Sequence, residues 1–258
     1  MYEEHLRFAT ALAAEAGEIM HQHFDANPAS VYKADKSIVT VADTEINDLV
    51  IARVRTAFPD HAIDGEEASF GAGDQVWVCD PIDGTSMFAM SVPTSTFSIA
   101  YCEQGEPKVA VVLDPWLDKL YTAVKGAGAF CNQEPLRVSA LGLDDLGAMG
   151  NFDYWPTAAY DILAPVADIM HRTYTVSLGS CVRTLLMVAS GRLAFSIFPG
   201  GEGKNMDVAT GKLMIEEAGG RTSDLWGADQ RYDRPIRGFV GSNGVVHDQI
   251  LEYLRQLA

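Results

Sequence analysis

The chain has 258 residues, of which 48% are hydrophobic and 21% are charged, and its formal net charge at pH 7 is −16. This apolar fraction excludes a disordered chain and is typical of a globular protein. The negative charge argues against binding to nucleic acid or to an anionic membrane surface, because both require a basic face.

The cysteines and the amino terminus predict a cytoplasmic protein. No pair of cysteines has C-x-x-C spacing, so we expect reduced thiols rather than a disulfide framework or a zinc site. Glu3 and Glu4 begin a segment without a long apolar core, which does not predict a signal peptide. No apolar run has the length of a membrane span. The cysteines are Cys79, Cys102, Cys131 and Cys181.

Hydrophobic periodicity in the first half predicts helices and then a series of short strands. Apolar residues at helical spacing predict an amphipathic helix over residues 2–24 and another that begins at Asp43 and ends near residue 58. A hairpin or mobile loop is expected between them. Three consecutive strands without intervening helices should be antiparallel neighbours. The predicted strands cover residues 62–63, 76–79, 96–101, 108–113 and 119–124.

The second half alternates helices with strands, which predicts layers of helices and sheets. No segment is rich enough in Gly, Pro or Ser to separate independent domains. We therefore expect halves at residues 1–140 and 141–258 that form one compact unit. Gly219 and Gly220 are expected to end the third helix of this half. The predicted helices cover residues 156–171, 181–190, 207–218 and 245–257, and the strands cover 174–178, 195–198 and 239–242.

The most informative segment reads W-V-C-D-P-I-D-G-T. An apolar strand is expected to end at Asp80, because Pro81 has no N–H for the sheet. Asp83 then follows within reach of Asp80, and the Ile82 carbonyl is a third oxygen donor. Oxygen ligands of this kind suit Mg²⁺. The alternative is an Asx-rich turn that only caps a helix.

Two further acidic clusters favour the metal site. Glu66 and Glu67 follow a short apolar stretch, and Asp207 lies in the first turn of a predicted helix. A carboxylate cluster that holds Mg²⁺ also reconciles the negative charge of the chain with a phosphate substrate, because the ions invert the local potential.

Three segments together resemble the inositol monophosphatase family of Mg²⁺-dependent phosphomonoesterases. They are G-E-E at Glu66, D-P-I-D-G-T at Asp80, and M-D-V-A-T-G-K-L-M-I-E-E-A-G-G from Met206. The resemblance includes Lys36 to Asp43 and K-G-x-G-A-F at Lys125, so it covers nearly the whole chain. It implies an α+β fold with a layered αβαβα sandwich, as in inositol monophosphatase and fructose-1,6-bisphosphatase, and a homodimer.

The resemblance also implies roles for site residues. Two or three Mg²⁺ ions, with Mn²⁺ as a substitute, would be held by oxygen ligands, Asp80 bridging two of them. Asp43 would work with Thr85 to orient and deprotonate the attacking water, although the residues alone also allow Asp43 to be a helix N-cap. Glu67 would assist. The implied ligands are Glu66, Asp80, Ile82, Asp83 and Asp207, and the implied phosphate and substrate contacts are Gly84, Thr85, Asp83, Gly179, Ser180, Cys181 and Asp207.

The substrate side departs from the inositol pattern. Gly200 lies where inositol enzymes place a Glu, and Cys181 lies where Ala is common. Arg183 and Lys204 are candidates for binding a second anionic group; alternatively both are surface charges, or Arg183 reaches a partner subunit. The expected substrate is a small phosphorylated metabolite, namely inositol monophosphate or a related sugar or polyol monophosphate. The alternative substrates are fructose 1,6-bisphosphate, histidinol phosphate and a 3′-phosphoadenosine 5′-phosphate type nucleotide. A further alternative is that the chain is a non-catalytic protein that binds Mg²⁺ and phosphate.

Overall fold

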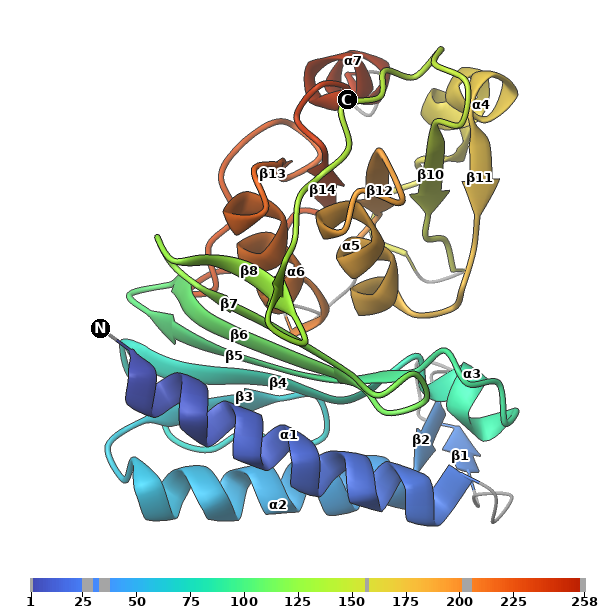
Figure 1. The fold of residues 1–258 in the computed structure, drawn as a ribbon. Helices are drawn as coiled ribbons and strands as arrows, with labels where there is room; N and C mark the ends of the chain where they lie inside the picture. The colour runs from blue at the N-terminus through green and yellow to red at the C-terminus, as the bar shows by residue number, and fades with distance from the viewer. Residues whose placement is uncertain (1, 25–29, 33–37, 156–157, 201–205, 256–258) are drawn as a thin grey trace.

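A computed structural model describes residues 2–24, 30–32, 38–155, 158–200 and 206–255. Helices and sheets alternate in five layers (Figure 1). The first layer contains α1 (Glu3–Phe24) and α2 (Val41–Ala57). A seven-stranded sheet follows, then α5 (Cys181–Ala189) with α6 (Met206–Glu217), then a five-stranded sheet. The last layer is α4 (Leu163–Arg172) with α7 (His247–Leu254), so the predicted αβαβα sandwich is confirmed.

The seven-stranded sheet follows the chain in the order β3-β4-β5-β6-β7-β8-β9. Only β3 and β4 are parallel, and every later pair is antiparallel, as predicted for strands without intervening helices. Strands β8 and β9 were not predicted. The bounds are β3 Ala62–Gly65, β4 Gln75–Asp83, β5 Thr96–Glu103, β6 Glu106–Asp114, β7 Lys119–Val124, β8 Gly128–Cys131 and β9 Glu134–Pro135.

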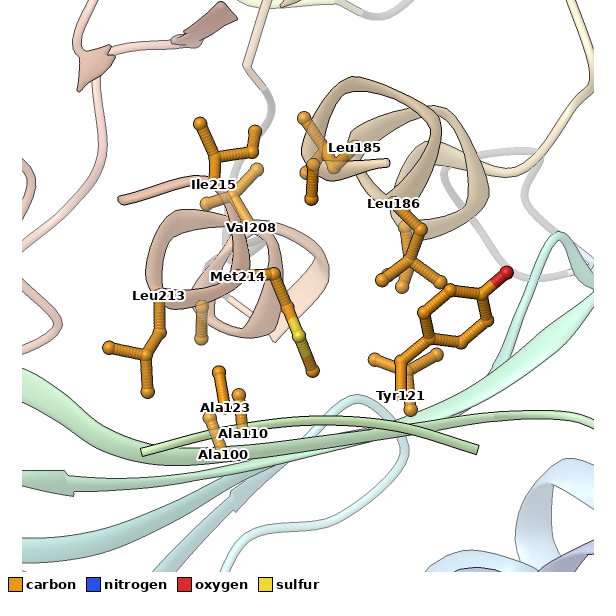
Figure 2. Close-up of a cluster of buried hydrophobic side chains, with 14 of the residues drawn as sticks. Ala100, Ala110, Tyr121, Ala123, Leu185, Leu186, Val208, Leu213, Met214 and Ile215 are labelled. Atoms are coloured by element: carbon orange, nitrogen blue, oxygen red, sulfur yellow. The ribbon is translucent and has the colours of Figure 1, made fainter. Parts of the chain in front are cut away.

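Alternating side chains of this sheet form two cores. Residues such as Trp77 and Val111 face α1 and α2, whereas their neighbours along the strands face α5 and α6. On the second face, three alanines of β5, β6 and β7 lie under Leu213 and Met214 of α6 (Figure 2). Small side chains allow the helix to approach the sheet closely. The alanines are Ala100, Ala110 and Ala123.

The five-stranded sheet has the order β11-β10-β12-β14-β13. The first three strands are parallel, and β14 is antiparallel to both β12 and β13. The carboxyl ends of β10 and β12 point toward the seven-stranded sheet (Figure 1). The sequence patterns did not predict β10 or β13. The bounds are β10 Met149–Phe152, β11 Tyr174–Val176, β12 Phe195–Phe198, β13 Arg221–Ser223 and β14 Phe239–Ser242.

The helix predicted over 156–171 begins only at Leu163. The Asp161 carboxylate accepts the Leu163 N–H at 3.1 Å, which favours a helix start at this point. Pro165 then lies in the first turn, where its missing N–H has no intrahelical partner to lose. A helix from residue 156 would have placed Pro165 in its interior. Likewise, Asn243 accepts the N–H groups of the two residues before α7, which therefore begins at His247.

Near the amino terminus, β1 (Ser30–Tyr32) pairs with β2 (Ile38–Thr40) in an antiparallel hairpin, one of the two predicted alternatives. Lys36 and Lys204 lie outside the described residues, as does most of the Gly200 to Lys204 loop. All four cysteines are free thiols in the structure. Within the described part of the chain, no helix is long and apolar enough to cross a membrane.

Gly150 makes the contact of β10 with β12 possible. It pairs with Phe195, and a Cβ atom at Gly150 would lie 2.0 Å from the Phe195 ring. Gly150→Ala should therefore lower the free energy of unfolding by about 1–3 kcal/mol, the usual range for overpacking. Urea denaturation measures this change. Gly73→Ala is the matched control, because its Cβ would meet no atom within 4 Å. Equal stability of the two variants would contradict the predicted clash.

His247 should make stability depend on pH. It is fully buried, with Ser223 Oγ 3.0 Å from Nε2 and Ser242 Oγ 2.8 Å from Nδ1. Burial lowers its pKa to about 4, with a smaller contribution from Arg221. Below pH 6.5 the unfolded chain binds a proton that the folded chain excludes until about pH 4, so acidification destabilises the fold.

We expect this one group to lower the free energy of unfolding by about 2 kcal/mol between pH 7 and pH 5. Urea denaturation at both pH values measures the free energy of unfolding. Its decrease from pH 7 to pH 5 should be smaller by about 2 kcal/mol in His247→Gln than in the unmodified protein. His171→Gln, at an exposed position of α4, is the control and should keep the full loss. The same loss in all three proteins would refute the prediction.

Candidate active site

The end of β4 differs from the sequence prediction. The strand does not end at Asp80 but continues through Pro81 to Asp83. Asp80 pairs with Ser98 and Asp83 with Thr96, so β4 contains one extra residue, a β-bulge. Residues three apart on a regular strand point to opposite faces, and one inserted residue returns them to the same side. The bulge therefore accommodates Pro81 and directs both carboxylates to one site.

Asp80 is the centre of an acidic cluster. It is 2% exposed, and burial raises the pKa of its carboxyl group well above the ordinary value. The negative charges of Glu66, Asp207, Asp83 and Asp43 raise it further, in that order. These carboxylates come from the end of β3, from α6, from β4 and from α2. The fold thus brings the three predicted acidic segments together around Asp80.

Asp83 connects the seven-stranded sheet to helix α5. Its Oδ1 accepts the Cys181 N–H at 3.0 Å, and its Oδ2 accepts the Val182 N–H at 3.1 Å and the Thr96 hydroxyl at 3.3 Å. The Ser180 hydroxyl also donates to Oδ2. Burial raises the pKa of Asp83, and these four hydrogen bonds oppose that increase. Asp83 therefore caps the amino terminus of α5, a contact that the sequence patterns did not predict.

Asp43 is not the N-cap of α2. Thr40 occupies that position, and both its N–H and its hydroxyl donate to Asp43 Oδ2, at 2.8 and 2.5 Å. The Thr85 hydroxyl lies 3.1 Å from Asp43 Oδ1, which is the pairing that the family resemblance implied. Burial raises the pKa of Asp43 to about 6, against the effect of the Thr40 hydrogen bonds. The structure thus holds a buried carboxyl group of near-neutral pKa beside the Thr85 hydroxyl.

Gly84 is required where α3 (Thr85–Ala89) begins. Its φ is +84°, and a Cβ atom there would lie 2.9 Å from the Gly179 carbonyl oxygen. The D-G-T segment therefore packs directly against the loop before α5. The Thr85 hydroxyl is also 2.9 Å from the Ile82 carbonyl oxygen, which keeps a second lone pair. The first N–H groups of α3 have no intrahelical acceptor and are a suitable place for an anion.

The donor set suits a hard divalent cation. Every acidic neighbour of Asp80 offers oxygen, and burial of like charges around one carboxylate is unfavourable unless a cation neutralises them. Asp83 Oδ1 accepts the Cys181 N–H, and a carboxylate oxygen has a second lone pair that can bind a cation. In the described ranges, no three acidic, histidine or cysteine side chains are already arranged to hold a metal ion. The residues fit Mg²⁺ in chemistry and charge.

Arg183 has a structural partner. Its Nη1 donates to Asp114 Oδ2 at 2.7 Å, and its Nε donates to the Thr94 carbonyl at 2.5 Å. The Asp114 side chain is 1% exposed, so the pair is nearly buried. Arg183 Nη2 is buried and has no hydrogen-bond partner among the described residues, so a role of Arg183 in binding a second anionic group stays a prediction. Thr96 is a site residue that the sequence analysis missed, and its pairing opposite Asp83 on the next strand was the available signal.

A buried carboxylate cluster between two sheets of a layered α+β fold, suited to Mg²⁺, defines the chain as a candidate phosphatase hydrolase. Comparisons with known proteins establish the class. The sequence model of the inositol monophosphatase family matches residues 1–258, and the chain belongs to this family. The resemblance stated from three sequence segments is therefore confirmed.

Individual relatives and a solved structure agree with this family assignment. A fructose-1,6-bisphosphatase/inositol-1-monophosphatase of Thermotoga maritima is 32% identical over 98% of this chain and 97% of its own length. Inositol monophosphatase 1 of Solanum lycopersicum is 32% identical over 98% of this chain and 95% of its own. The Nus factor SuhB of Xylella fastidiosa is 34% identical over 84% and 80%. A solved inositol monophosphatase structure from T. maritima superposes with a TM-score of 0.87 at 30% identity, covering 98% of each chain.

Proposed function

We propose that the chain hydrolyses a small phosphate monoester, an inositol, sugar or polyol phosphate, in a Mg²⁺-dependent in-line attack by water. The observation that supports this most strongly is the position of Asp80, buried among the charges of four other carboxylates. Two cations in such a site would stabilise the charges that develop on the attacking and leaving oxygens. Mn²⁺ is expected to substitute for Mg²⁺, and a third ion is compatible with the family resemblance.

The proposed ligands of the first ion are the Glu66 and Asp80 carboxylates and the Ile82 carbonyl. Those of the second are Asp80, Asp83 and Asp207. The charge effects on Asp80 support placing these carboxylates around it, since Glu66, Asp207 and Asp83 are its three strongest acidic neighbours. The Asp83 hydrogen bonds to α5 favour the ionised form of its carboxylate against the effect of burial, and they fix its orientation.

Asp43 and Thr85 are proposed to activate the water. The Thr85 hydroxyl has one proton and two acceptors within reach, Asp43 Oδ1 at 3.1 Å and the Ile82 carbonyl at 2.9 Å. We propose that it donates to Asp43 during the reaction, which leaves the Thr85 oxygen available to accept a hydrogen bond from water. As the water attacks phosphorus, its proton can pass to the Thr85 oxygen while the hydroxyl proton moves to Asp43. A pKa near 6 suits Asp43 as the final acceptor at neutral pH. Glu67 is proposed to assist from the segment that follows β3.

The phosphate is proposed to lie at the start of α3, where the Gly84 and Thr85 N–H groups donate to its oxygens. The neighbouring segment Gly179, Ser180 and Cys181 would border the substrate, because it packs on Gly84 and is tied to Asp83. Asp207, 8% exposed, would lie at the junction of ligand and substrate. We also propose that the two halves of the chain act as one unit, since these contacts join them.

The test is phosphate release from purified protein, supplied with inositol 1-phosphate, fructose 1,6-bisphosphate, histidinol phosphate and 3′-phosphoadenosine 5′-phosphate. We expect release with Mg²⁺, loss with EDTA and recovery on adding excess Mg²⁺. The substrate with the highest kcat/KM identifies the class. Measurable Mg²⁺ binding without release from any compound would refute hydrolysis and favour a non-catalytic binding protein.

We also propose a cytoplasmic location and a homodimeric assembly. Net charge of −16 supports a protein that does not bind nucleic acid, and free cysteines suit the cytoplasm. The family resemblance supports a homodimer. Analytical ultracentrifugation of the full chain should give twice the mass of 27.9 kDa.

A further inference from the structure

Asp153 is an acidic residue beside the site that neither the sequence patterns nor the proposed mechanism uses. It follows β10 directly, and its N–H donates to the Ile197 carbonyl at 2.9 Å, so it lies at the carboxyl ends of β10 and β12. These ends point toward the seven-stranded sheet (Figure 1). Burial raises the pKa of Asp153 to about 7, against a hydrogen bond from Asn151, and Asp83 raises it further.

Electrostatic effects on Cys181 place Asp153 next to the acidic cluster. Burial raises the pKa of the Cys181 thiol well above its ordinary value, and four carboxylates raise it further. Asp153 has the largest of these charge effects, ahead of Asp207, Asp83 and Asp80. Asp153 therefore borders the same space as the proposed metal ligands, but it comes from the five-stranded sheet.

One oxygen of this carboxylate has no partner. Asp153 Oδ2 is buried and accepts no hydrogen bond from the residues that the structure describes. A buried acceptor without a donor is unfavourable, and such atoms in native proteins usually have a functional explanation. The contrast with Asp83 is clear, since four donors satisfy that carboxylate in the same region. Asp153 Oδ2 is thus an acceptor without a donor, beside a proposed substrate site.

We propose that Asp153 accepts a hydrogen bond from a donor group, a hydroxyl or an ammonium, on the leaving alcohol of the substrate. The proposal rests on the hydrolytic function proposed above. A carboxylate repels the phosphate, which the proposed cations and the start of α3 hold at the opposite sheet, so Asp153 is suited to the other part of the ester. An ionised carboxylate has no proton to donate, so Asp153 in that form acts only as an acceptor.

The same residue would select against substrates with a second phosphate near this position. A second anion beside Asp153 would add like-charge repulsion to the binding of such a substrate. Monophosphates that carry hydroxyl or amino groups are therefore the favoured substrate class. Fructose 1,6-bisphosphate and phosphoadenosine nucleotides are disfavoured.

The experiment compares substrates that differ only in the donor group. Glycerol 2-phosphate and isopropyl phosphate share a carbon skeleton, and phosphoethanolamine and ethyl phosphate form a second pair. We expect Asp153→Ala to lower kcat/KM about 10- to 100-fold for the members with donors, as loss of one hydrogen bond to a charged group predicts. The members without donors should change less than about twofold. Asp168→Ala, an exposed acid of α4, is the control and should change neither.

Asp153→Asn separates the two kinds of donor, because the amide keeps an acceptor but loses the charge. A larger fall for phosphoethanolamine than for glycerol 2-phosphate identifies an ammonium as the natural donor, and the reverse order identifies a hydroxyl. Equal falls for both members of each pair would overturn the proposal and assign Asp153 a structural role. The proposal would also be overturned if the unmodified protein hydrolyses all four esters and Asp153→Ala leaves the ratio of kcat/KM between the members of each pair unchanged. Absence of any Mg²⁺-dependent hydrolysis would instead refute the proposed function itself.

Discussion

Asp80→Asn is expected to lower kcat by about a thousandfold, since the loss of the charge of a proposed metal ligand should remove roughly 4 kcal/mol of transition-state stabilisation. The same substitution should raise the thermal unfolding midpoint in EDTA. Asp80 is buried, and the surrounding carboxylates already disfavour its charge, so a neutral amide of the same shape relieves both penalties in metal-free protein. Steady-state kinetics with Mg²⁺ and calorimetry with EDTA measure the two effects.

The two readouts distinguish a ligand from a merely structural residue. Asp168→Asn, which changes an exposed carboxylate of α4, should alter neither turnover nor the unfolding midpoint. Near-normal turnover of Asp80→Asn with Mg²⁺ would refute the two-metal assignment. A lower unfolding midpoint of Asp80→Asn in EDTA would show that repulsion among the carboxylates around Asp80 does not destabilise the metal-free protein.

Asp83→Ala is expected to abolish turnover and also to destabilise the protein by about 3 kcal/mol, in contrast to Asp80→Asn. Removal of the Asp83 carboxylate leaves the Cys181 and Val182 N–H groups without their acceptor, and each buried unpaired donor costs about 1–3 kcal/mol. The amino terminus of α5 also loses its negative charge. Urea denaturation in EDTA measures this loss separately from metal binding.

Thr96→Val is the matched control for Asp83. It removes only one of the four donors, at 3.3 Å, and should cost less than about 1 kcal/mol. If Asp83→Ala unfolds at the same urea concentration as the unmodified protein, then these hydrogen bonds do not stabilise the junction of the seven-stranded sheet with α5.

The local sequence was sufficient for features that depend on neighbours along the chain. Short apolar runs separated by turn residues predicted the antiparallel strands over 96–124, and these strands bury both faces, one against α1 and α2 and the other against α5 and α6. The helix start at Leu163 was missed although a local signal existed, since Pro165 cannot lie in a helix interior. Strand β10 was missed because Gly150 has no side chain and its partner strand is distant in sequence.

At the site, too, some features follow from the local sequence and others only from the tertiary structure. The sequence by itself determined which carboxylates could bind Mg²⁺, because Asp80 and Asp83 follow an apolar strand and flank a proline, a pattern whose chemistry is local. Only the tertiary structure decided which groups surround each carboxylate and form hydrogen bonds with it. Asp83 caps a helix that begins nearly a hundred residues later, and Asp153 borders Cys181 from the second sheet. Charge repulsion and hydrogen bonding depend on distances through space, and those distances arise only when both sheets pack on α5 and α6.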